Sequence, residues 1–267
     1  MFVLKADGRK EEFSQEKIVR TCVRSGVAPD MARSIAKKIA GSVQNGMTTH
    51  KIYTMILAEL DMANGSSIFM LREAIANLDP ISFELYVKKV LEAHGYRCMW
   101  NKLIKGMNVE HQVDVIANKE RSFLVECKRH FNPHRFTGLN ICLQVEARLN
   151  DIMLGSKNGK NNYKFDAAWV VTNTKFSDHA KMYAKGVGIR LTGWRYDEEF
   201  ALEKLVQAKK VLPVTILKTD VSVQRGLLNK KILTLQDLIR EKPKIGAKDL
   251  ISQANSILSK LGERPKA

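Results

Sequence analysis

Two apolar stretches, residues 109–117 and 123–130, flank the short polar segment 118–122 and constrain the fold of this chain more than any other feature. Both stretches are rich in β-branched residues, so the pattern predicts a β-hairpin. In a symmetric hairpin the turn is centred on Glu120. Side chains alternate between the two faces of a strand, and one face of this hairpin is apolar. That face, which we expect to point into a core, consists of Val113, Val115, Val125 and Cys127.

The opposite face of the hairpin is polar. Asp114 lies opposite Glu126 in the symmetric register, and opposed residues of an antiparallel pair project to the same side of the sheet. Lys128 shares this side, with Gln112 opposite it. Two carboxylates this close resist ionising together unless a divalent cation lies between them. A lysine beside such a cation can stabilise an anionic oxygen or hold a water molecule. Together these residues indicate a phosphodiester hydrolysis site.

The same side chains could instead form an exposed strand face with one salt bridge, because 27% of the chain is charged. The triplet Glu126-Cys127-Lys128 is, however, the only acid-x-Lys sequence in the 267 residues. It also ends an apolar strand, with Asp114 opposite it. The pattern therefore favours the catalytic interpretation.

Asp114, eleven intervening residues and then Glu126-x-Lys128 resemble the signature of the PD-(D/E)xK nucleases. The surrounding sequences, Val-Glu-His-x-Val-Asp-Val-Ile-Ala and Val-Glu-Cys-Lys-Arg-His, resemble the Mrr-like branch, the type IV restriction endonucleases. Val113 stands where the family name has proline, and the resemblance extends to about residue 205. It implies a DNA endonuclease dependent on Mg²⁺ or Mn²⁺, with Asp114 and Glu126 as metal ligands and Lys128 beside the attacking water or the phosphate.

The resemblance also implies candidates on two predicted helices. In these nucleases the helix before the hairpin often contributes an acid, which here is Glu84 in the helix predicted for residues 81–96. Glu84 could instead only interact with the helix dipole. The helix predicted for residues 139–154 often contributes a glutamine or a basic residue, which here is Gln144, with Arg148 one turn away. Alternatively, both side chains only lie in solvent on the surface of the helix.

The formal net charge of +16 is unevenly distributed. Residues 1–80 carry 11 basic and 9 acidic side chains, residues 81–210 carry 22 and 14, and residues 211–267 carry 11 and 5. This balance favours a polyanionic partner, most simply DNA, although a solvated lysine-rich surface is the alternative. The chain has no apolar run of membrane-spanning length and no signal peptide, so we expect no membrane association. Its four scattered cysteines are typical of a reduced, cytoplasmic protein.

The sequence of residues 1–80 predicts a β-hairpin around Asp7-Gly8, followed by four short helices. We expect Ser14 to cap the first helix and Thr48 or Thr49 to cap the third. The sequences Val3-x-Lys5-x-Asp7-Gly8 and Glu11-x-Phe13-Ser14-x-x-Lys17-Ile18 resemble the ATP-cone, a nucleotide-binding regulatory domain. The resemblance implies binding of ATP or dATP by Val3, Lys5, Asp7, Gly8, Ser14, Lys17 and Thr49. Two lysines near a capped helix N-terminus make an anion site. A helical module that only mediates protein contacts is the alternative.

We expect an α/β chain in three parts. Residues 1–80 form a mostly helical ATP-cone, a β-hairpin with four helices. Residues 81–210 form a PD-(D/E)xK core with a central mixed β-sheet flanked by helices, because a buried strand at 165–172 begins a strand–helix–strand block. Residues 211–267 form a small helical accessory region that contacts DNA.

The sequence thus predicts a metal-dependent endonuclease, a hydrolase of restriction or DNA repair, whose activity or assembly responds to ATP or dATP. The chain has no Gly-x-x-x-x-Gly-Lys-Ser/Thr loop, so the nucleotide is expected to regulate the enzyme and not to drive it. One alternative is a nucleotide-sensing DNA-binding regulator on an inactive nuclease core. Another is a repair nuclease for branched DNA. A homodimer is expected if both strands are cut.

Overall fold

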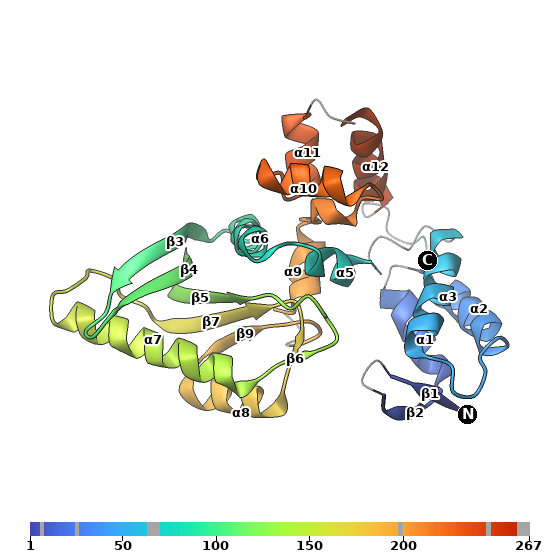
Figure 1. Ribbon diagram of the computed structural model, residues 1–267, viewed down its shortest axis with the longest axis horizontal. Helices are drawn as coiled ribbons and strands as arrows, with labels where there is room; N and C mark the ends of the chain where they lie inside the picture. Colours follow the sequence, from blue (N-terminus) through green and yellow to red (C-terminus); the bar gives the residue numbers. More distant parts are fainter. Residues whose placement is uncertain (6–7, 25–26, 63–69, 197–199, 244–246, 261–267) are drawn as a thin grey trace. The chain divides into compact units, whose positions relative to one another are not determined.

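The computed structural model describes residues 1–5, 8–24, 27–62, 70–196, 200–243 and 247–260, and has the expected mixed α/β class (Figure 1). Two compact units make up the chain. One holds Met1–Leu71 and the segment from Asn255, and the other is Arg72–Ala254. No helix in the described part of the chain is both long and apolar enough to cross a membrane.

The first unit begins with the expected hairpin, in which β1 (Phe2–Leu4) pairs antiparallel with β2 (Lys10–Glu12). Gly8 in its turn has a φ of +81°, which glycine adopts without strain. Three helices follow: α1 (Gln15–Arg24), α2 (Pro29–Ala40) and α3 (Thr49–Met62). Their apolar faces share one core with the hairpin, formed by residues such as Val3, Ile18, Cys22, Ile35, Ile39, Ile56 and Leu60. The start expected for a fourth helix, at Ser66 or Ser67, lies outside the described residues, and α5 (Leu71–Ala76) comes next.

The second unit is built on a five-stranded sheet in the order β3-β4-β5-β7-β9. The strand β4 (Glu110–Asn118) pairs antiparallel with both of its neighbours, β3 (Arg97–Lys105) and β5 (Ser122–Lys128). The strands β7 (Ala167–Thr172) and β9 (Arg190–Thr192) run parallel to β5. Ile116 pairs with Leu124, so the β4–β5 hairpin is symmetric about Glu120, as predicted.

Helices cover both faces of this sheet (Figure 1). On one face α6 (Pro80–Ala93) packs against β3, β4 and β5. On the other, α7 (Leu139–Lys157) packs against β3 and β7, and α8 (Asp178–Val187) against β9. Because both faces are covered, all six residues of β7 are buried. Asp79 fixes the start of α6 by accepting a hydrogen bond of 2.9 Å from the amide of Ser82.

The turn between β3 and β4 is held against α7 by Asp151. The carboxylate of Asp151 accepts hydrogen bonds from the amides of Asn108 at 3.0 Å and Val109 at 3.3 Å, and lies 2.8 Å from Nε2 of His111. Burial opposes ionisation of this carboxyl, but the hydrogen bonds from His111, Asn108 and Val109 outweigh it and lower the pKa of Asp151 to about 2. Gly155 lets the turn approach the helix closely, because a Cβ there would lie 2.6 Å from the backbone of the turn.

A short parallel pair, β6 (Phe136–Thr137) with β8 (Lys175–Phe176), lies beside the main sheet. The chain then continues through α9 (Leu202–Ala208), the 3₁₀ turn η1 (Val214–Ile216), α10 (Val221–Asn229), α11 (Leu235–Glu241) and α12 (Ala247–Lys260). The described part of residues 211–267 is therefore helical, as predicted.

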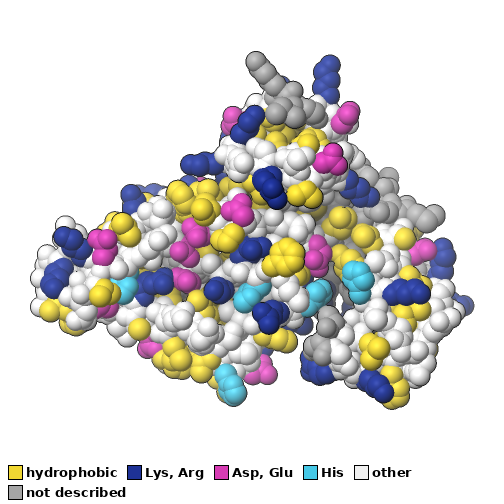
Figure 2. Space-filling view, viewed as in Figure 1, with side chains coloured by type: hydrophobic (Ala, Val, Ile, Leu, Met, Phe, Trp, Pro, Cys, Tyr) yellow, Lys and Arg dark blue, Asp and Glu magenta, His cyan; other side chains and the backbone are white. Residues whose placement is uncertain are grey.

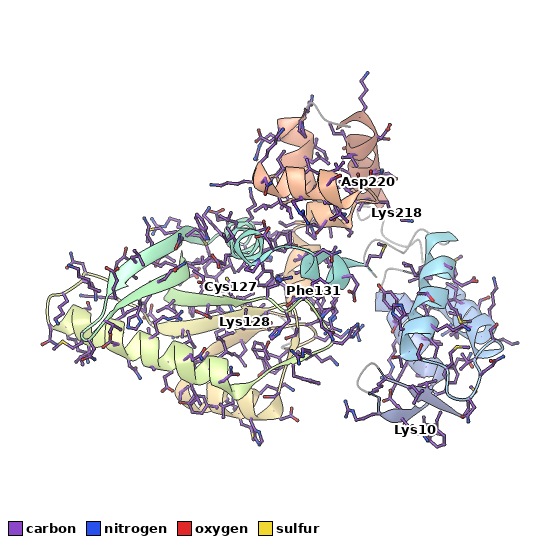
Figure 3. The ribbon with its side chains drawn as sticks, viewed as in Figure 1. Lys10, Cys127, Lys128, Phe131, Lys218 and Asp220 are labelled. Atoms are coloured by element: carbon purple, nitrogen blue, oxygen red, sulfur yellow. The ribbon has the colours of Figure 1, made fainter. Side chains whose placement is uncertain are left out.

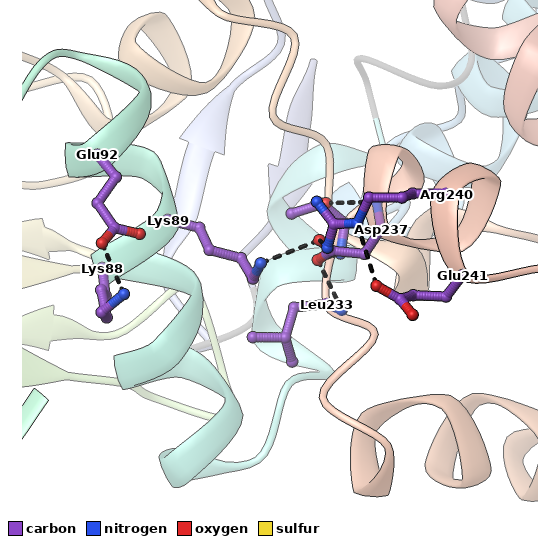
Figure 4. A network of polar contacts seen from close by, with 8 residues as sticks. Lys88, Lys89, Glu92, Leu233, Asp237, Arg240 and Glu241 are labelled. Atoms are coloured by element: carbon purple, nitrogen blue, oxygen red, sulfur yellow. Dashed lines mark hydrogen bonds and ion pairs between the residues drawn. The ribbon is translucent and has the colours of Figure 1, made fainter.

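Asp237 joins α11 to α6 (Figure 4). Its carboxylate is 2.9 Å from Nζ of Lys89 and 3.0 Å from Nη2 of Arg240, and it completes a capping box with Thr234. Its side chain is only 5% exposed. A buried carboxylate with this many donors fixes the position of α11 against α6.

Candidate active site

Asp114 is bonded to the strand that carries the Glu126-Cys127-Lys128 motif. Its Oδ2 accepts a hydrogen bond of 2.7 Å from the backbone amide of Cys127. The β4–β5 ladder runs from the Asn118–Ser122 pair to the Val115–Val125 pair, and Asp114 comes next in this register, opposite Glu126. The predicted apolar face points inward, since Val113, Val115 and Val125 are fully buried. The polar face thus brings the two carboxylates together as expected.

The environment of Asp114 disfavours its charged form. Burial is the largest cause, followed by the charge of Glu126, and together they raise the pKa of Asp114 to about 7, against the opposing effect of the Cys127 amide. At neutral pH this carboxyl is therefore only partly ionised. A bound cation would keep it ionised, which is the behaviour expected of a carboxylate placed to receive one.

Glu126 has a partner that sequence patterns did not identify. Nη1 of Arg148, on α7, donates a hydrogen bond to Oε2 of Glu126, and the two side chains are only 24% and 14% exposed. Gln144, the predicted contributor from the same helix, is exposed one turn earlier. The spacing of Gln144 and Arg148 indicated their shared face, but only the structure shows that the arginine reaches the carboxylate.

Glu84 on α6 is a third acid near this pair. Its Oε2 accepts a hydrogen bond of 3.0 Å from Nε1 of Trp100. Burial raises the pKa of Glu84, and the charge of Glu126 adds to this effect, while the Trp100 bond opposes it. Gln112, by contrast, is exposed.

Lys128 is the last residue of β5 and its side chain is exposed (Figure 3). Its carbonyl accepts a hydrogen bond of 2.6 Å from Oγ1 of Thr172. Just beyond it, the side-chain amide of Asn173 bonds to both backbone groups of His130, accepting from N–H and donating to C=O, each at 2.8 Å. The hydroxyls of Thr137, Thr172 and Thr174 lie within 2.7–3.2 Å of one another. These side chains fix the end of β5. Two of them come from the sequence Val171-Thr172-Asn173 at the end of β7, whose role was not predicted.

In the first unit, two of the predicted nucleotide-binding residues share a counter-ion. Nζ of Lys17 is 2.6 Å and Nζ of Lys5 is 3.2 Å from the same oxygen of Glu11. The hydrogen bond from Lys17 is the largest influence on Glu11, and with Lys5 it lowers the pKa of Glu11 despite a smaller opposing effect of burial. Both cations therefore converge on one point beside the hairpin.

The remaining predicted residues of this unit lie around the hairpin. Val3 is buried in the core, Gly8 is in the turn and Ser14 directly precedes α1. Asp7 lies outside the described residues. The amide of Leu4 bonds to the carbonyl of Met47 at 3.0 Å, which brings the hairpin beside the start of α3. There Oγ1 of Thr48 accepts a hydrogen bond of 3.2 Å from the amide of Lys51, so Thr48 caps the helix and Thr49 is its first residue.

The carboxylates of Asp114 on β4 and Glu126 on β5 are ligands that suit a magnesium ion. No group of three or more His, Cys, Asp or Glu side chains arranged to hold a metal occurs among the described residues. Mg²⁺, however, commonly takes one or two carboxylates and completes its shell with water and substrate phosphate. Asp114 and Glu126 provide these two carboxylates, and the pKa of Asp114 is raised first by burial and then by the charge of Glu126.

Comparison with known proteins agrees with this geometry. The restriction endonuclease family of the Mrr catalytic type matches residues 75–195, and the ATP cone domain family matches residues 1–67. An uncharacterized protein of Archaeoglobus fulgidus is 37% identical over 152 residues, which are 57% of this chain and 82% of that protein. A second uncharacterized protein of the same organism is 50% identical over 46 residues, 17% of this chain and 89% of its own length. The crystal structure of a protein of unknown function, AF1548, superposes with a TM-score of 0.56 at 31% identity and covers 69% of this chain and 99% of that one.

Proposed function

Because the chain belongs to the Mrr-type restriction endonuclease family and carries an ATP cone domain before its nuclease domain, we propose that it is a metal-dependent DNA endonuclease regulated by ATP or dATP. The proposal assigns residues 1–80 to regulation, 81–210 to catalysis and 211–267 to DNA contact. Its partners are DNA and an adenine nucleotide, and the enzyme acts as a homodimer where both strands are cut.

The observation that carries the proposal is the Asp114–Glu126 pair. Two half-buried carboxylates on adjacent strands, one with its pKa raised to about 7, are poorly suited to a purely structural role. They would hold Mg²⁺ or Mn²⁺, which when bound polarises a phosphate oxygen and lowers the pKa of a water molecule. The amide of Cys127 orients the carboxylate of Asp114 toward this point.

The remaining roles follow from the position of each side chain. Lys128, exposed at the end of β5, orients the attacking water or stabilises the charge that develops on the phosphate. Arg148 balances the charge of Glu126 and offers a second cation to the phosphate. Glu84, whose pKa is raised by burial, would exchange a proton with a group near the pair. Gln112 and Gln144 are exposed and would contact the substrate only.

At the cone, Lys5 and Lys17 already converge on Glu11, an arrangement that supports an anion site. A triphosphate would replace the Glu11 carboxylate as their counter-ion. Regulation then requires that the nucleotide bind more tightly to one state of the enzyme than to another.

The test is incubation of the full-length protein with supercoiled, linear and branched DNA, in Mg²⁺ or EDTA, with and without ATP. The expected result is nicking or cleavage that requires Mg²⁺ and is altered by ATP. DNA binding without cleavage under all of these conditions would contradict the nuclease assignment and favour a nucleotide-sensing regulator on an inactive core.

A further inference from the structure

Two phenylalanines between β5 and α7 are exposed, Phe131 in the loop that follows β5 and Phe136 at the start of β6. The side chain of Phe131 is 78% exposed and that of Phe136 is 55% exposed. In the same unit Phe83, Phe123, Phe165 and Phe176 are all buried, as expected for this residue type. Figure 3 labels Phe131 close to Cys127 and Lys128, where β5 leaves the sheet.

The loop that carries these rings is held in place along its length. Asn173 bonds to both backbone groups of His130, and Nη2 of Arg72 donates to the carbonyl of Pro133. The ring of His130 is 3.1 Å from Oγ1 of Thr137. Nη1 of Arg129 donates to the carbonyl of Ala76 at 2.8 Å. A loop fixed in this way cannot easily fold its exposed rings into the core, so they gain burial only from a partner.

The charges around Phe131 identify that partner. Residues 128–136 contain Lys128, Arg129, Arg135 and two histidines, and no acid. Glu73, which is 3.5 Å from Nε2 of His134, is an acid that contacts this segment. Figure 2 shows basic, histidine and hydrophobic side chains, with some acidic ones among them, interspersed over this face of the nuclease unit. Aromatic rings among cations are typical of surfaces that bind nucleic acid with unpaired bases, because each ring stacks on a base while the cations contact phosphates.

We propose that Phe131 stacks on an unpaired base of the DNA next to the phosphate held at Lys128, so that this nuclease prefers DNA with unpaired bases to a continuous duplex. Phe131 is three residues beyond Lys128, which places the ring beside the cleavage site. In a continuous duplex the faces of the bases are covered by their neighbours, so the ring has no surface to stack on unless a base is displaced. The inference rests on the proposed nuclease function and adds to it the kind of DNA that is recognised.

The test compares two DNA molecules that bind to the full-length protein in EDTA. One is a fully paired duplex, and the other is the same duplex with a short unpaired thymine bulge. Affinities are measured by fluorescence anisotropy for the wild type, Phe131→Ala, Phe131→Trp and Met182→Ala. Met182, on α8, is 63% exposed and serves as the matched control for loss of an exposed apolar side chain.

The wild type should bind the bulged DNA more tightly than the paired one. Loss of one stacked base predicts that Phe131→Ala lowers the affinity for bulged DNA by about 5- to 150-fold, with little change for the paired duplex. Phe131→Trp should retain the preference, and Met182→Ala should bind both DNA molecules as the wild type does. Unchanged melting temperatures would show that the variants are folded.

Equal losses of affinity for both DNA molecules in Phe131→Ala would overturn the inference, as would no loss for either; the latter would point to a protein partner for the loop. These results are separable from the cleavage assay. Mg²⁺-dependent cleavage with no effect of Phe131→Ala contradicts this inference alone. Bulge binding that depends on Phe131 in a protein that never cleaves contradicts the proposed catalysis alone.

Discussion

The guanidinium of Arg148 on α7 is hydrogen-bonded to the carboxylate of Glu126 on β5. A cation of the protein thus occupies one side of a carboxylate that we assign to a metal ion. The ion pair offsets the repulsion between Glu126 and Asp114 in the absence of metal, and it places a positive charge where a phosphate would bind.

Arg148→Gln should bind Mn²⁺ more tightly than the wild type and cleave DNA more slowly. Binding improves because no cation competes for the oxygens of Glu126. Cleavage falls by about 10²–10³-fold if the guanidinium stabilises charge on the phosphate, by analogy with the loss of one oxyanion donor. Calorimetry with Mn²⁺ and single-turnover cleavage measure the two effects. Asn150→Ala, at an exposed position of the same helix that has no assigned role, is the comparison and should change neither. Weaker metal binding in Arg148→Gln would mean that the arginine orients Glu126 for the metal.

Asp114→Asn and Glu126→Gln should abolish cleavage while DNA binding persists, because each removes a metal ligand and leaves the basic surface intact. Lys128→Ala should reduce the rate by about 10²–10³-fold. Plasmid nicking in Mg²⁺ and anisotropy in EDTA give the two readouts. Glu120→Gln is the matched control, since Glu120 is an acid of the same hairpin whose side chain is 79% exposed. Near-normal nicking by either carboxylate variant would show that the site lies elsewhere.

Asp151→Asn should destabilise the protein at neutral pH, and the difference from the wild type should shrink in acid. Burial alone would raise the pKa of Asp151 from its ordinary value of 3.8. The hydrogen bonds from His111, Asn108 and Val109 outweigh burial and lower this pKa to about 2. A carboxyl whose pKa is lowered on folding stabilises the folded state. This stabilisation is fully present above pH 3.8 and is lost as the pH falls toward 2. Urea midpoints at a series of pH values check this. A difference that stays constant across this range would show that the charge of Asp151 does not matter.

ATP and dATP, but not GTP, should raise the melting temperature of the full-length protein. A ligand at 100-fold excess over its Kd stabilises the folded state by about 2.7 kcal/mol. Lys5→Ala/Lys17→Ala should lose this shift. Glu11→Gln should enlarge it, because removing the carboxylate frees both lysines for phosphate. A shift that survives the double substitution would place the nucleotide at another site.

The sequence predicts the hairpin register and the Asp114–Glu126 pair because side-chain alternation is a local rule and the symmetric turn aligns the two strands. It also predicts the order of elements in the nuclease core. Contacts made by long side chains across elements were not predictable in the same way. The link from Arg148 to Glu126 and the convergence of Lys5 and Lys17 on Glu11 depend on how helices lie over strands, which local patterns do not encode.

The cap of α3 shows a second limit. Thr48 and Thr49 have the same chemistry, and only the position at which the helix begins makes Thr48 the cap. The Thr137–Thr172–Thr174 hydroxyls were missed for a related reason, since the three residues meet only after β6, β7 and β8 are placed.

Lys128 is the last residue of β5 that pairs with β7, and the segment beyond it is held by side chains: Thr172 bonds to the carbonyl of Lys128, and the amide of Asn173 takes the place of a neighbouring strand for His130. A strand end fixed by backbone pairing loosens only when the sheet itself opens. A segment fixed by an amide and three hydroxyls can loosen by rotation about a few side-chain bonds while the sheet stays intact. The segment that follows Lys128 therefore has its own local opening equilibrium, and on warming the protein should lose the proposed nuclease activity over a lower temperature range than the one in which its secondary structure melts.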